Sequence, residues 1–295
     1  MTAAAHVGNP WIAGARPRTL PAAVVPVAVG AACSAGLTDP TWWRAVLALV
    51  VSLALQVGVN YANDYSDGIR GTDDVRVGPV RLVASGLAPA KTVKRAAFAA
   101  FGVAAVAGLV LALTTSLWLL VVGVAALLAG WFYTGGPKPY GYLGLGEIFV
   151  FVFFGLVATI GTTFAVAEQV TALSVVMGSA VGALACALLV INNLRDIPTD
   201  RNVGKKTLAV RLGDARTRWL YAALISSAFV AGGVAAAVWR PWVALIGIAI
   251  ALAVAPLHRV MRGAIGRDLI AVLGETGRLQ MAFGLLASLG LVLSR

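Results

Sequence analysis

The sequence predicts an all-α protein that crosses a membrane about nine times. Apolar residues make up 60% of its 295 residues and charged residues only 12%, against roughly one quarter charged residues in ordinary globular chains. Apolar runs of about 20 residues, enough for a helix to cross a hydrocarbon core of about 30 Å, recur along the whole chain. The runs are rich in Ala, Leu and Gly and lack the alternation of a membrane β-barrel, so helices are expected.

Nine apolar runs follow one another and define the expected spans. The first begins directly after Arg18 and has spanning length, so no cleavable signal peptide is expected. The polar residues left between the runs are too few to give nine amphipathic helices solvated faces, which excludes a soluble helical core. We therefore expect residues 1–295 to form a single integral membrane domain. The nine expected spans are Leu20–Leu37, Trp42–Asn63, Ala96–Thr114, Leu117–Tyr133, Leu145–Ala167, Ala172–Asn193, Leu220–Trp239, Pro241–Leu257 and Leu279–Leu293.

The lysines and arginines are distributed unevenly over the expected loops. If the N-terminus is cytoplasmic, only Arg44, Arg240 and Arg295 lie outside, and the other 20 of the 23 basic residues lie inside. This positive-inside pattern predicts a multi-pass protein of the cytoplasmic membrane, with the N-terminus and polar loops inside and the C-terminus outside. It also accounts for the net charge of +11 without nucleic acid as a partner.

Two clusters of acids stand at the ends of expected spans, in "NYANDYSDGIRGTDD" and in "INNLRDIPTD". The first contains Asn60 and Asp64, and the second contains Asn192 and Asp196 at the same spacing, 132 positions later in both cases. The two clusters are four spans apart and therefore on the same side of the membrane, which suggests an internal duplication. We call residues 60–74 the first Asp-rich motif and residues 192–200 the second.

The spacing predicts that each motif presents its polar groups on one helical face. Asn60, Asp64 and Asp67 share a face, as do Asn192, Asp196 and Asp200 if the helix continues. Pro198 makes that continuation doubtful, because proline removes an amide donor and clashes with the preceding turn.

Acids at a membrane boundary repel one another unless they line a cavity or bind something. Carboxylates and amide oxygens suit Mg²⁺, and with no His or Cys near either motif zinc is disfavoured. The alternative is that the acids cap helices or pair with loop arginines.

Basic and glycine-rich loops on the same side complete a site for a diphosphate. Lys205 and Lys206 follow the second motif, and cations placed there would stabilise the charge on a departing diphosphate. In "YTGGPKPYGYLGLGE", between the fourth and fifth spans, Lys138, Tyr140 and Tyr142 border the expected site. A solvated basic loop is the alternative for each lysine.

Five segments in order resemble the UbiA superfamily of intramembrane prenyltransferases: "ARPRTLPAA", "NYANDYSDGIRGTDD", "GPVRLVASG", "YTGGPKPYGYLGLGE" and "NNLRDIPTDRNVGKKTLAVRLG". The resemblance covers essentially the whole chain and is strongest to the members that prenylate 1,4-dihydroxy-2-naphthoate in menaquinone biosynthesis. The chain departs from the common N-D-x-x-D-x-x-x-D form at Gly71, where the last Asp is missing and Asp73 and Asp74 are the next acids.

The resemblance implies roles for particular residues. Asp64, Asp67, Asp196 and Asp200 would be catalytic. Mg²⁺ would be held by Asn60, Asp64, Asn192, Asp196 and Asp200. The diphosphate would be bound by Arg70, Lys138, Lys205 and Lys206. Candidates for contact with the aromatic acceptor are Arg16, Arg18, Tyr65 and Tyr140.

The reaction implied by the resemblance is transfer of a polyprenyl group from an all-trans-polyprenyl diphosphate to 1,4-dihydroxy-2-naphthoate, with loss of diphosphate and carbon dioxide, giving demethylmenaquinone. A lateral opening would let the isoprenoid tail stay in membrane lipid. Another acceptor, such as 4-hydroxybenzoate, is the nearest alternative. A CDP-alcohol phosphotransferase would need one contiguous D-G-x-x-A-R pattern, which is absent. A cation-coupled transporter, a more distant alternative, would place its acids near mid-membrane.

Overall fold

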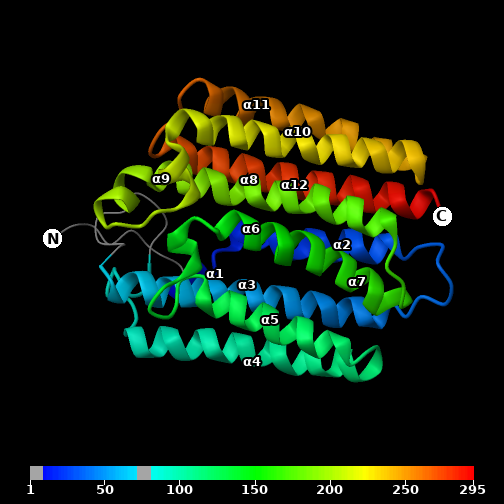
Figure 1. Cartoon of the computed structure of the whole chain (residues 1–295), viewed down its shortest axis with the longest axis horizontal. Helices are drawn as coiled ribbons and strands as arrows, with labels where there is room; N and C mark the ends of the chain where they lie inside the picture. Colours follow the sequence, from blue (N-terminus) through cyan, green and yellow to red (C-terminus); the bar gives the residue numbers. More distant parts are fainter. Residues whose placement is uncertain (1–8, 72–80) are drawn as a thin grey trace.

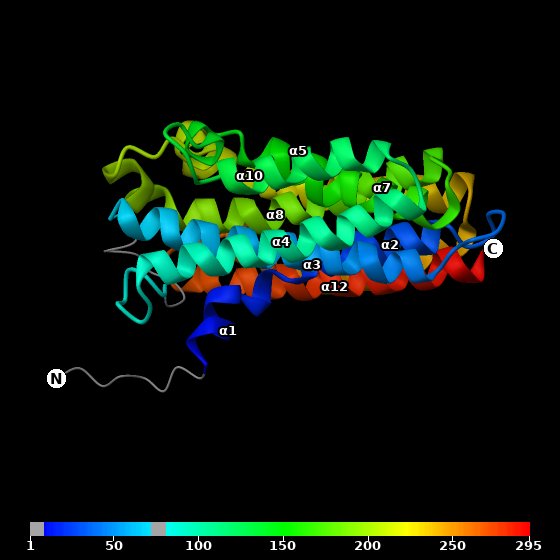
Figure 2. The same cartoon turned by 90° about the horizontal axis from the view of Figure 1, so that it is seen from below.

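In the computed structural model, which describes residues 9–71 and 81–295, every regular element is helical. The elements are α1 (Pro10–Ala15), η1 (Pro17–Thr19), α2 (Pro21–Cys33), α3 (Trp43–Ile69), α4 (Ala90–Thr114), α5 (Trp118–Phe132), η2 (Tyr140–Leu143), α6 (Gly146–Val150), η3 (Phe151–Val157), α7 (Ala158–Ala167), α8 (Ala172–Asn202), α9 (Leu208–Leu212), α10 (Asp214–Val238), η4 (Pro241–Ala249), α11 (Ile250–Met261) and α12 (Asp268–Leu293). The long helices run side by side along a common axis (Figures 1 and 2).

The long apolar helices fall where the sequence predicts spans. Within the described residues, seven helices are long and apolar enough to cross a membrane, and two shorter apolar helices, α2 and α5, occupy the first and fourth expected positions. Elements α6, η3 and α7 form one of the seven, and η4 with α11 forms another. The prediction of an all-α membrane protein is confirmed, whereas the number of nine complete spans stays a prediction.

Helix α8 continues through Pro198, which resolves the doubt that this proline raised about the continuation of the helix. The helix extends to Asn202, and Thr199 donates its hydroxyl to the carbonyl of Asp196, 3.0 Å away. Pro198 lies only four residues before the helix ends, so its missing N–H removes one hydrogen bond from the last turns rather than dividing the helix. Asn192, Asp196 and Asp200 therefore belong to one continuous helix.

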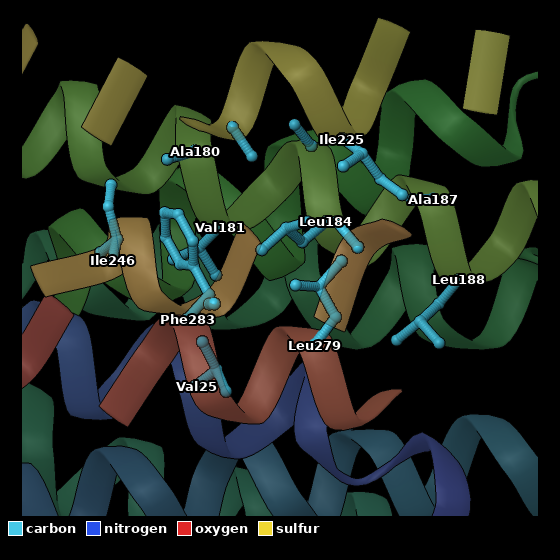
Figure 3. Packing of buried hydrophobic residues seen from close by; sticks show 14 of the residues in the cluster. Val25, Ala180, Val181, Leu184, Ala187, Leu188, Ile225, Ile246, Leu279 and Phe283 are labelled. Carbon is cyan, nitrogen blue, oxygen red and sulfur yellow. The ribbon is translucent and has the colours of Figure 1, made fainter. Parts of the chain in front are cut away.

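The main core surrounds α8, which packs against α10, α12 and α2 (Figure 3). Val181 and Leu184 of α8 meet Phe283 and Leu279 of α12 within this core, and all four are fully buried. Small residues bring helices close where no side chain intervenes. A Cβ on Gly155 would lie 2.5 Å from the Cα of Gly182, which fixes the span of α6, η3 and α7 against α8.

Three arginines lie together at one end of the bundle. Arg240 donates to the carbonyls of Ala35 and Ser294, 2.8 and 2.7 Å away, and Arg295 lies beside Arg240 around Gly36. Arg44 forms an ion pair of 2.7 Å with Glu168 near the same end. These three arginines lie at the end where α3 begins and α12 finishes, opposite to the end that contains both Asp-rich motifs (Figure 1).

Candidate active site

A cavity of about 310 Å³ runs along the interior of the bundle and has a polar end and an apolar remainder. The helices α2, α3, α4, α5 and α8 line it, together with the span formed by α6, η3 and α7. Its polar end is formed by the last turns of α3 and α8 and by the loops that follow α5 and α8. Residues of the two Asp-rich motifs therefore meet at one end of one cavity.

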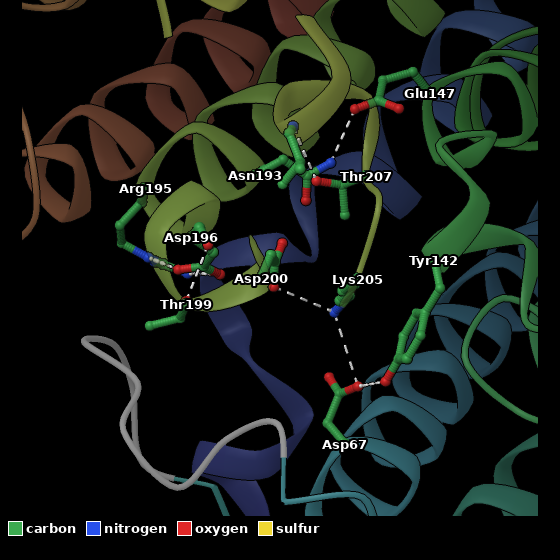
Figure 4. A network of polar contacts seen from close by, with 11 residues as sticks. Asp67, Tyr142, Glu147, Asn193, Arg195, Asp196, Thr199, Asp200, Lys205 and Thr207 are labelled. Carbon is green, nitrogen blue, oxygen red and sulfur yellow. Dashed lines mark hydrogen bonds and ion pairs between the residues drawn. The ribbon is translucent and has the colours of Figure 1, made fainter. Parts of the chain in front are cut away.

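Lys205 connects the two motifs across the cavity (Figure 4). Its Nζ lies 3.9 Å from the Oδ1 of Asp67 on α3 and 3.9 Å from the Oδ1 of Asp200 on α8. The ring of Tyr142 lies beneath this ammonium, with its centroid 4.6 Å away, and its hydroxyl donates to Asp67. A hydrogen bond of 2.8 Å from the amide of Lys205 to the carbonyl of Asp200 fixes the start of the loop. Two carboxylates and one cation from three segments thus converge at the cavity's polar end.

Two asparagines that the sequence analysis did not select also line the cavity. Asn63 lies one turn before Asp67 on α3, and its Oδ1 accepts the hydroxyl of Thr134 at 2.7 Å. Asn193 donates its amide to the Oε1 of Glu147, 2.9 Å away, across the α6–α8 contact. The sequence did contain a signal for Asn63, because Asn63 and Asp67 have the same Asn-x-x-x-Asp spacing as Asn60 and Asp64.

Asp196 is held by its own neighbour. The guanidinium of Arg195 contacts both carboxylate oxygens of Asp196, at 2.7 and 2.9 Å, and is itself buried. Asp196 and Asn192 both line the cavity. The paired guanidinium holds one carboxylate orientation at the cavity wall.

Asp64, which the sequence analysis expected in the site, does not line the cavity. Its carboxylate is fully buried and accepts the backbone amides of Leu82 and Val83, at 2.8 and 3.0 Å. Asp64 and Asp67 are three positions apart on neighbouring parts of one helical face, but the segment at Leu82 and Val83 covers Asp64, whereas Asp67 lines the cavity. Among the motif residues that line the cavity, Asn63 and Asp67 are repeated by Asn192 and Asp196, 129 positions later in both cases (192 − 63 and 196 − 67) rather than 132.

Asn60 lines the cavity, but its amide group is used to anchor the chain before α2. It donates to the carbonyl of Ala15 at 2.8 Å and to the hydroxyl of Thr19 at 3.1 Å, and it accepts from Gln56 at 3.2 Å. Arg16 lines the cavity next to this network and approaches the carbonyl of Asn60 at 3.4 Å. The buried amide network therefore positions Arg16 at the cavity's polar end.

Three of the four expected diphosphate contacts do not line the cavity. Lys138 and Lys206 are exposed, and Arg70 donates to the carbonyls of Thr134 and Gly136 at 2.5 and 2.6 Å. Arg70 therefore fixes the loop that presents Thr134. Of the four, only Lys205 reaches the cavity.

The structure also separates the expected acceptor contacts. Tyr140 lines the cavity, stacks on Phe149 with centroids 3.9 Å apart and donates to the carbonyl of Ala129; burial raises the pKa of Tyr140, which keeps its hydroxyl protonated. Tyr65 instead stacks on Trp131 outside the cavity, and Arg18 lies in a different hollow. Of the four residues expected to contact the aromatic acceptor, Arg16 and Tyr140 therefore remain as candidates.

Arg81 also lines the cavity. It lies in the segment "GPVRLVASG", but the sequence analysis did not select it as a site residue. It is buried and lines the cavity directly before Leu82, whose amide Asp64 holds. Asp64 thus acts on the site indirectly by fixing the segment that presents Arg81. Asp73 and Asp74 lie outside the described residues.

The donor chemistry at the polar end fits Mg²⁺. No three His, Cys, Asp or Glu side chains among the described residues form a preassembled metal cluster. Mg²⁺, however, takes only one or two protein carboxylates and completes its shell with waters and substrate phosphates. Asp67, Asn192, Asp196 and Asp200 supply oxygen donors from both walls of the cavity, so they fit a cation that is shared with a substrate.

The rest of the cavity is apolar and wide. Phe149, Phe153 and Phe154 line one wall, and Leu119 and Leu111 lie toward the far end. Gly123 and Gly161 also line this part, and a Cβ on either would meet no atom within 4 Å. A long unbranched or isoprenoid chain could therefore lie along the bundle axis.

Comparison with known proteins gives consistent matches over most of the chain. Residues 23–274 match the model of the UbiA prenyltransferase family. The chain is 52% identical over 275 residues to a 1,4-dihydroxy-2-naphthoate octaprenyltransferase of Mycobacterium tuberculosis, covering 93% of this chain and 94% of that protein. It is 37% identical over 234 residues to the protein of that name from Escherichia coli, covering 75% and 74%.

Solved structures share the fold. A UbiA homologue from Archaeoglobus fulgidus bound to GPP and Mg²⁺ superposes with a TM-score of 0.68 at 16% identity, covering 94% of this chain and 99% of that one. A UbiA homologue from Aeropyrum pernix in its apo form gives a TM-score of 0.69 at 17% identity, covering 93% and 97%.

Proposed function

This chain belongs to the UbiA prenyltransferase family, and we propose that it transfers a polyprenyl group from an all-trans-polyprenyl diphosphate to 1,4-dihydroxy-2-naphthoate. The single observation that supports this most is the cavity: acids of two motifs and Lys205 occupy one end, and an apolar shaft occupies the rest. A charged head on a long apolar tail matches that division. The acceptor is proposed from the names of the relatives, several of which are naphthoate prenyltransferases.

The diphosphate end of the donor would lie between α3 and α8. Asp67, Asn192, Asp196 and Asp200 would hold Mg²⁺ there. When bound, Mg²⁺ would offset the negative charge that develops on the leaving diphosphate. Lys205 would add a second positive charge, because its ammonium already lies between the two carboxylates that face the diphosphate.

The isoprenoid tail would occupy the apolar shaft. Phe149, Phe153 and Phe154 offer aromatic surface near the polar end, and the open space beside Gly123 and Gly161 accommodates the chain beyond them. Burial of the tail removes apolar area from the membrane boundary and excludes water from the allylic carbon, which would otherwise be hydrolysed.

The acceptor would enter at the polar end beside Arg16 and Tyr140. A guanidinium binds a carboxylate through two parallel hydrogen bonds, so Arg16 is suited to orient the naphthoate carboxylate. Tyr140 offers a ring face held by its stack on Phe149. This arrangement would place the electron-rich ring next to the first carbon of the donor.

The bond changes then follow in order. The allylic carbon–oxygen bond breaks and its electron pair leaves with the diphosphate. The ring carbon that bears the carboxylate forms a bond to the allylic carbon. The carbon–carboxylate bond breaks next, carbon dioxide leaves, and its electron pair restores the aromatic ring. The product is the prenylated naphthalenediol, the reduced form of demethylmenaquinone.

We further infer that the polar end faces the cytoplasm. The predicted 20 to 3 division of basic residues supports this orientation, as does the location of Arg44, Arg240 and Arg295 at the opposite end. The acceptor and the diphosphate product would then exchange with the cytoplasm, and the C-terminus would lie outside.

Product mass after incubation of the purified protein tests the activity. With 1,4-dihydroxy-2-naphthoate, a polyprenyl diphosphate and Mg²⁺, the expected product has gained the prenyl group and lost carbon dioxide. Excess EDTA should abolish turnover, added Mg²⁺ should restore it, and zinc should substitute poorly. Prenylation of 4-hydroxybenzoate with retention of its carboxylate, and none of the naphthoate, would contradict the proposed acceptor. Full turnover in excess EDTA would contradict the metal.

A further inference from the structure

A second hollow, separate from the cavity, lies between η1 and the first turns of α12. Its volume is about 810 Å³, and its wall includes Arg18, Arg267, Arg278 and Glu275. The carbonyl of Arg18 lies 3.5 Å from the position that a Cβ on Gly277 would take, so η1 packs directly on α12 at this point. The hollow is at the end of the bundle that contains the Asp-rich motifs, because η1 precedes α2 there and α12 begins there.

The hollow is strongly basic. All three arginines are exposed, and none forms an ion pair with another residue in ranges 9–71 and 81–295. Glu275 is the acid among them, and its Oε1 is already paired with Arg259 at 3.3 Å. An anion placed among the arginines would therefore meet three uncompensated positive charges.

Glu275 adds an acceptor to this basic hollow. Its Oε2 is buried and has no hydrogen-bond partner in the described part of the chain. A buried carboxylate oxygen without a donor is costly, so a ligand that brings a hydroxyl would satisfy it. The combination favours a ligand with a phosphate and a hydroxyl close together.

An apolar stripe leads from the hollow down the outside of α12. Met281 lies on the wall of the hollow and is 42% exposed, and Leu285 and Leu289 follow at intervals of four residues with exposures of 71% and 47%. Side chains at this spacing lie on one face of a helix. The stripe lies within a helix long and apolar enough to cross a membrane, and in a bilayer it would face lipid tails next to the basic hollow.

We propose that this hollow binds one phospholipid whose headgroup joins an anionic phosphodiester to a hydroxyl, as in phosphatidylglycerol. The phosphate lies among Arg18, Arg267 and Arg278, the headgroup hydroxyl donates to the Oε2 of Glu275, and one acyl chain follows Met281, Leu285 and Leu289. A free phosphate or diphosphate shares the first interaction only. The apolar stripe and the acceptor of Glu275 favour the lipid.

The bound lipid would also influence the cavity through η1. In the sequence, Arg18 lies between Arg16, which lines the cavity, and Thr19, whose hydroxyl accepts hydrogen bonds from Asn60 and Gln56. A lipid that holds Arg18 therefore holds the segment that positions Arg16. This consequence for turnover rests on the proposed function, whereas lipid binding itself does not.

Lipid binding is tested on the full chain by native mass spectrometry after delipidation, with added phosphatidylglycerol, phosphatidylmethanol and phosphatidylcholine. Phosphatidylglycerol should bind at least about tenfold more tightly than phosphatidylcholine, because each arginine near an anionic headgroup contributes separately. Phosphatidylmethanol has the same charge and no headgroup hydroxyl, so it should bind less tightly than phosphatidylglycerol. Equal binding of all three lipids by the wild-type chain would refute the proposal.

Matched variants locate the site. The triple variant Arg18→Gln, Arg267→Gln, Arg278→Gln should lose the preference for phosphatidylglycerol. The control Arg95→Gln, Arg216→Gln, Arg262→Gln removes the same charge from exposed residues outside the hollow and should keep it. Glu275→Leu should abolish only the difference in affinity between phosphatidylglycerol and phosphatidylmethanol, and the preference of both over phosphatidylcholine should remain. If the control triple lost the preference for phosphatidylglycerol equally, net charge alone would explain the effect. If soluble glycerol phosphate or inorganic diphosphate competed at the same concentration as the lipid, the hollow would be a site for a free anion instead.

Discussion

Asp67 and Asp200 come from different Asp-rich motifs and lie on either side of one ammonium group, each with its Oδ1 3.9 Å from the Nζ of Lys205. Both carboxylates line the cavity, and Asp67 also accepts the hydroxyl of Tyr142. The relationship joins the end of α3 to the end of α8 through the loop that follows α8. It identifies the acids whose removal should affect turnover most.

Asp67→Asn and Asp200→Asn should each lower turnover by about 100-fold or more, because each removes a charge that acts where the diphosphate leaves. Groups that act on one transition state are not additive, so the double variant should be little worse than either single variant. Steady-state kcat on protein of verified monodispersity is the measurement. Asp39→Asn is the control, since Asp39 lies in the loop between α2 and α3 at the other end with a φ of 47° that Asn also tolerates. Near-normal turnover in Asp67→Asn would show that Asp67 of α3 does not act on the diphosphate.

Asp64→Asn should chiefly affect stability. An amide offers one acceptor where the carboxylate offers two, so the N–H of Leu82 or Val83 would face an NH₂ group, at a cost of about 1–3 kcal/mol. Thermal unfolding in detergent should show a lower midpoint, and turnover per folded molecule should fall less than in Asp67→Asn. The opposite order of effects on turnover would mean that Asp64, rather than Asp67, acts at the diphosphate site.

Arg16→Gln should raise KM for 1,4-dihydroxy-2-naphthoate by about tenfold or more, because a charge-assisted pair with the carboxylate is lost. KM for the polyprenyl diphosphate should change little. A naphthalenediol without the carboxylate provides the matched comparison: wild type and variant should handle it alike. If the variant lost the same factor with that acceptor, Arg16 would position the segment rather than bind the carboxylate.

Gly161→Leu should restrict the length of the prenyl group. A side chain at this position would enter the open part of the cavity, so kcat/KM should fall strongly for a long polyprenyl diphosphate and little for geranyl diphosphate. Gly233→Leu is the control, because it also meets open space but lies on α10 outside the cavity. Equal loss with both donors would show that the tail does not extend past Gly161.

Cysteine labelling tests the orientation. Lys91→Cys and Asn202→Cys lie at the polar end and should react with an impermeant thiol reagent only from the cytoplasmic side. Gln169→Cys lies at the opposite end and should react only from outside. The native Cys33 and Cys186 are buried and should contribute little background. Reaction of Lys91→Cys and Asn202→Cys from opposite sides would be incompatible with one shared site.

The positions of the membrane helices were predictable because they depend on local composition. A run of apolar residues long enough to cross a bilayer can be recognised without knowing its neighbours. The two Asp-rich motifs were found for a similar reason, since acids at the end of an apolar run are expensive and therefore conspicuous. Their convergence at one end of the bundle followed from counting the spans between them.

The sequence by itself therefore determined the helical fold, the end of the bundle that holds the site and the class of chemistry. The tertiary structure alone decided which acid of α3 meets the cavity, because Asp64 and Asp67 are three positions apart on one helical face and only packing decides which of them another segment covers. Leu82 and Val83 engage Asp64, while Tyr142 and Lys205 engage Asp67. The same holds for Arg16 and Arg18, two positions apart in the sequence. The left-handed backbone of Arg16, at a φ of 53°, turns the chain so that one guanidinium lines the cavity and the other lies over α12.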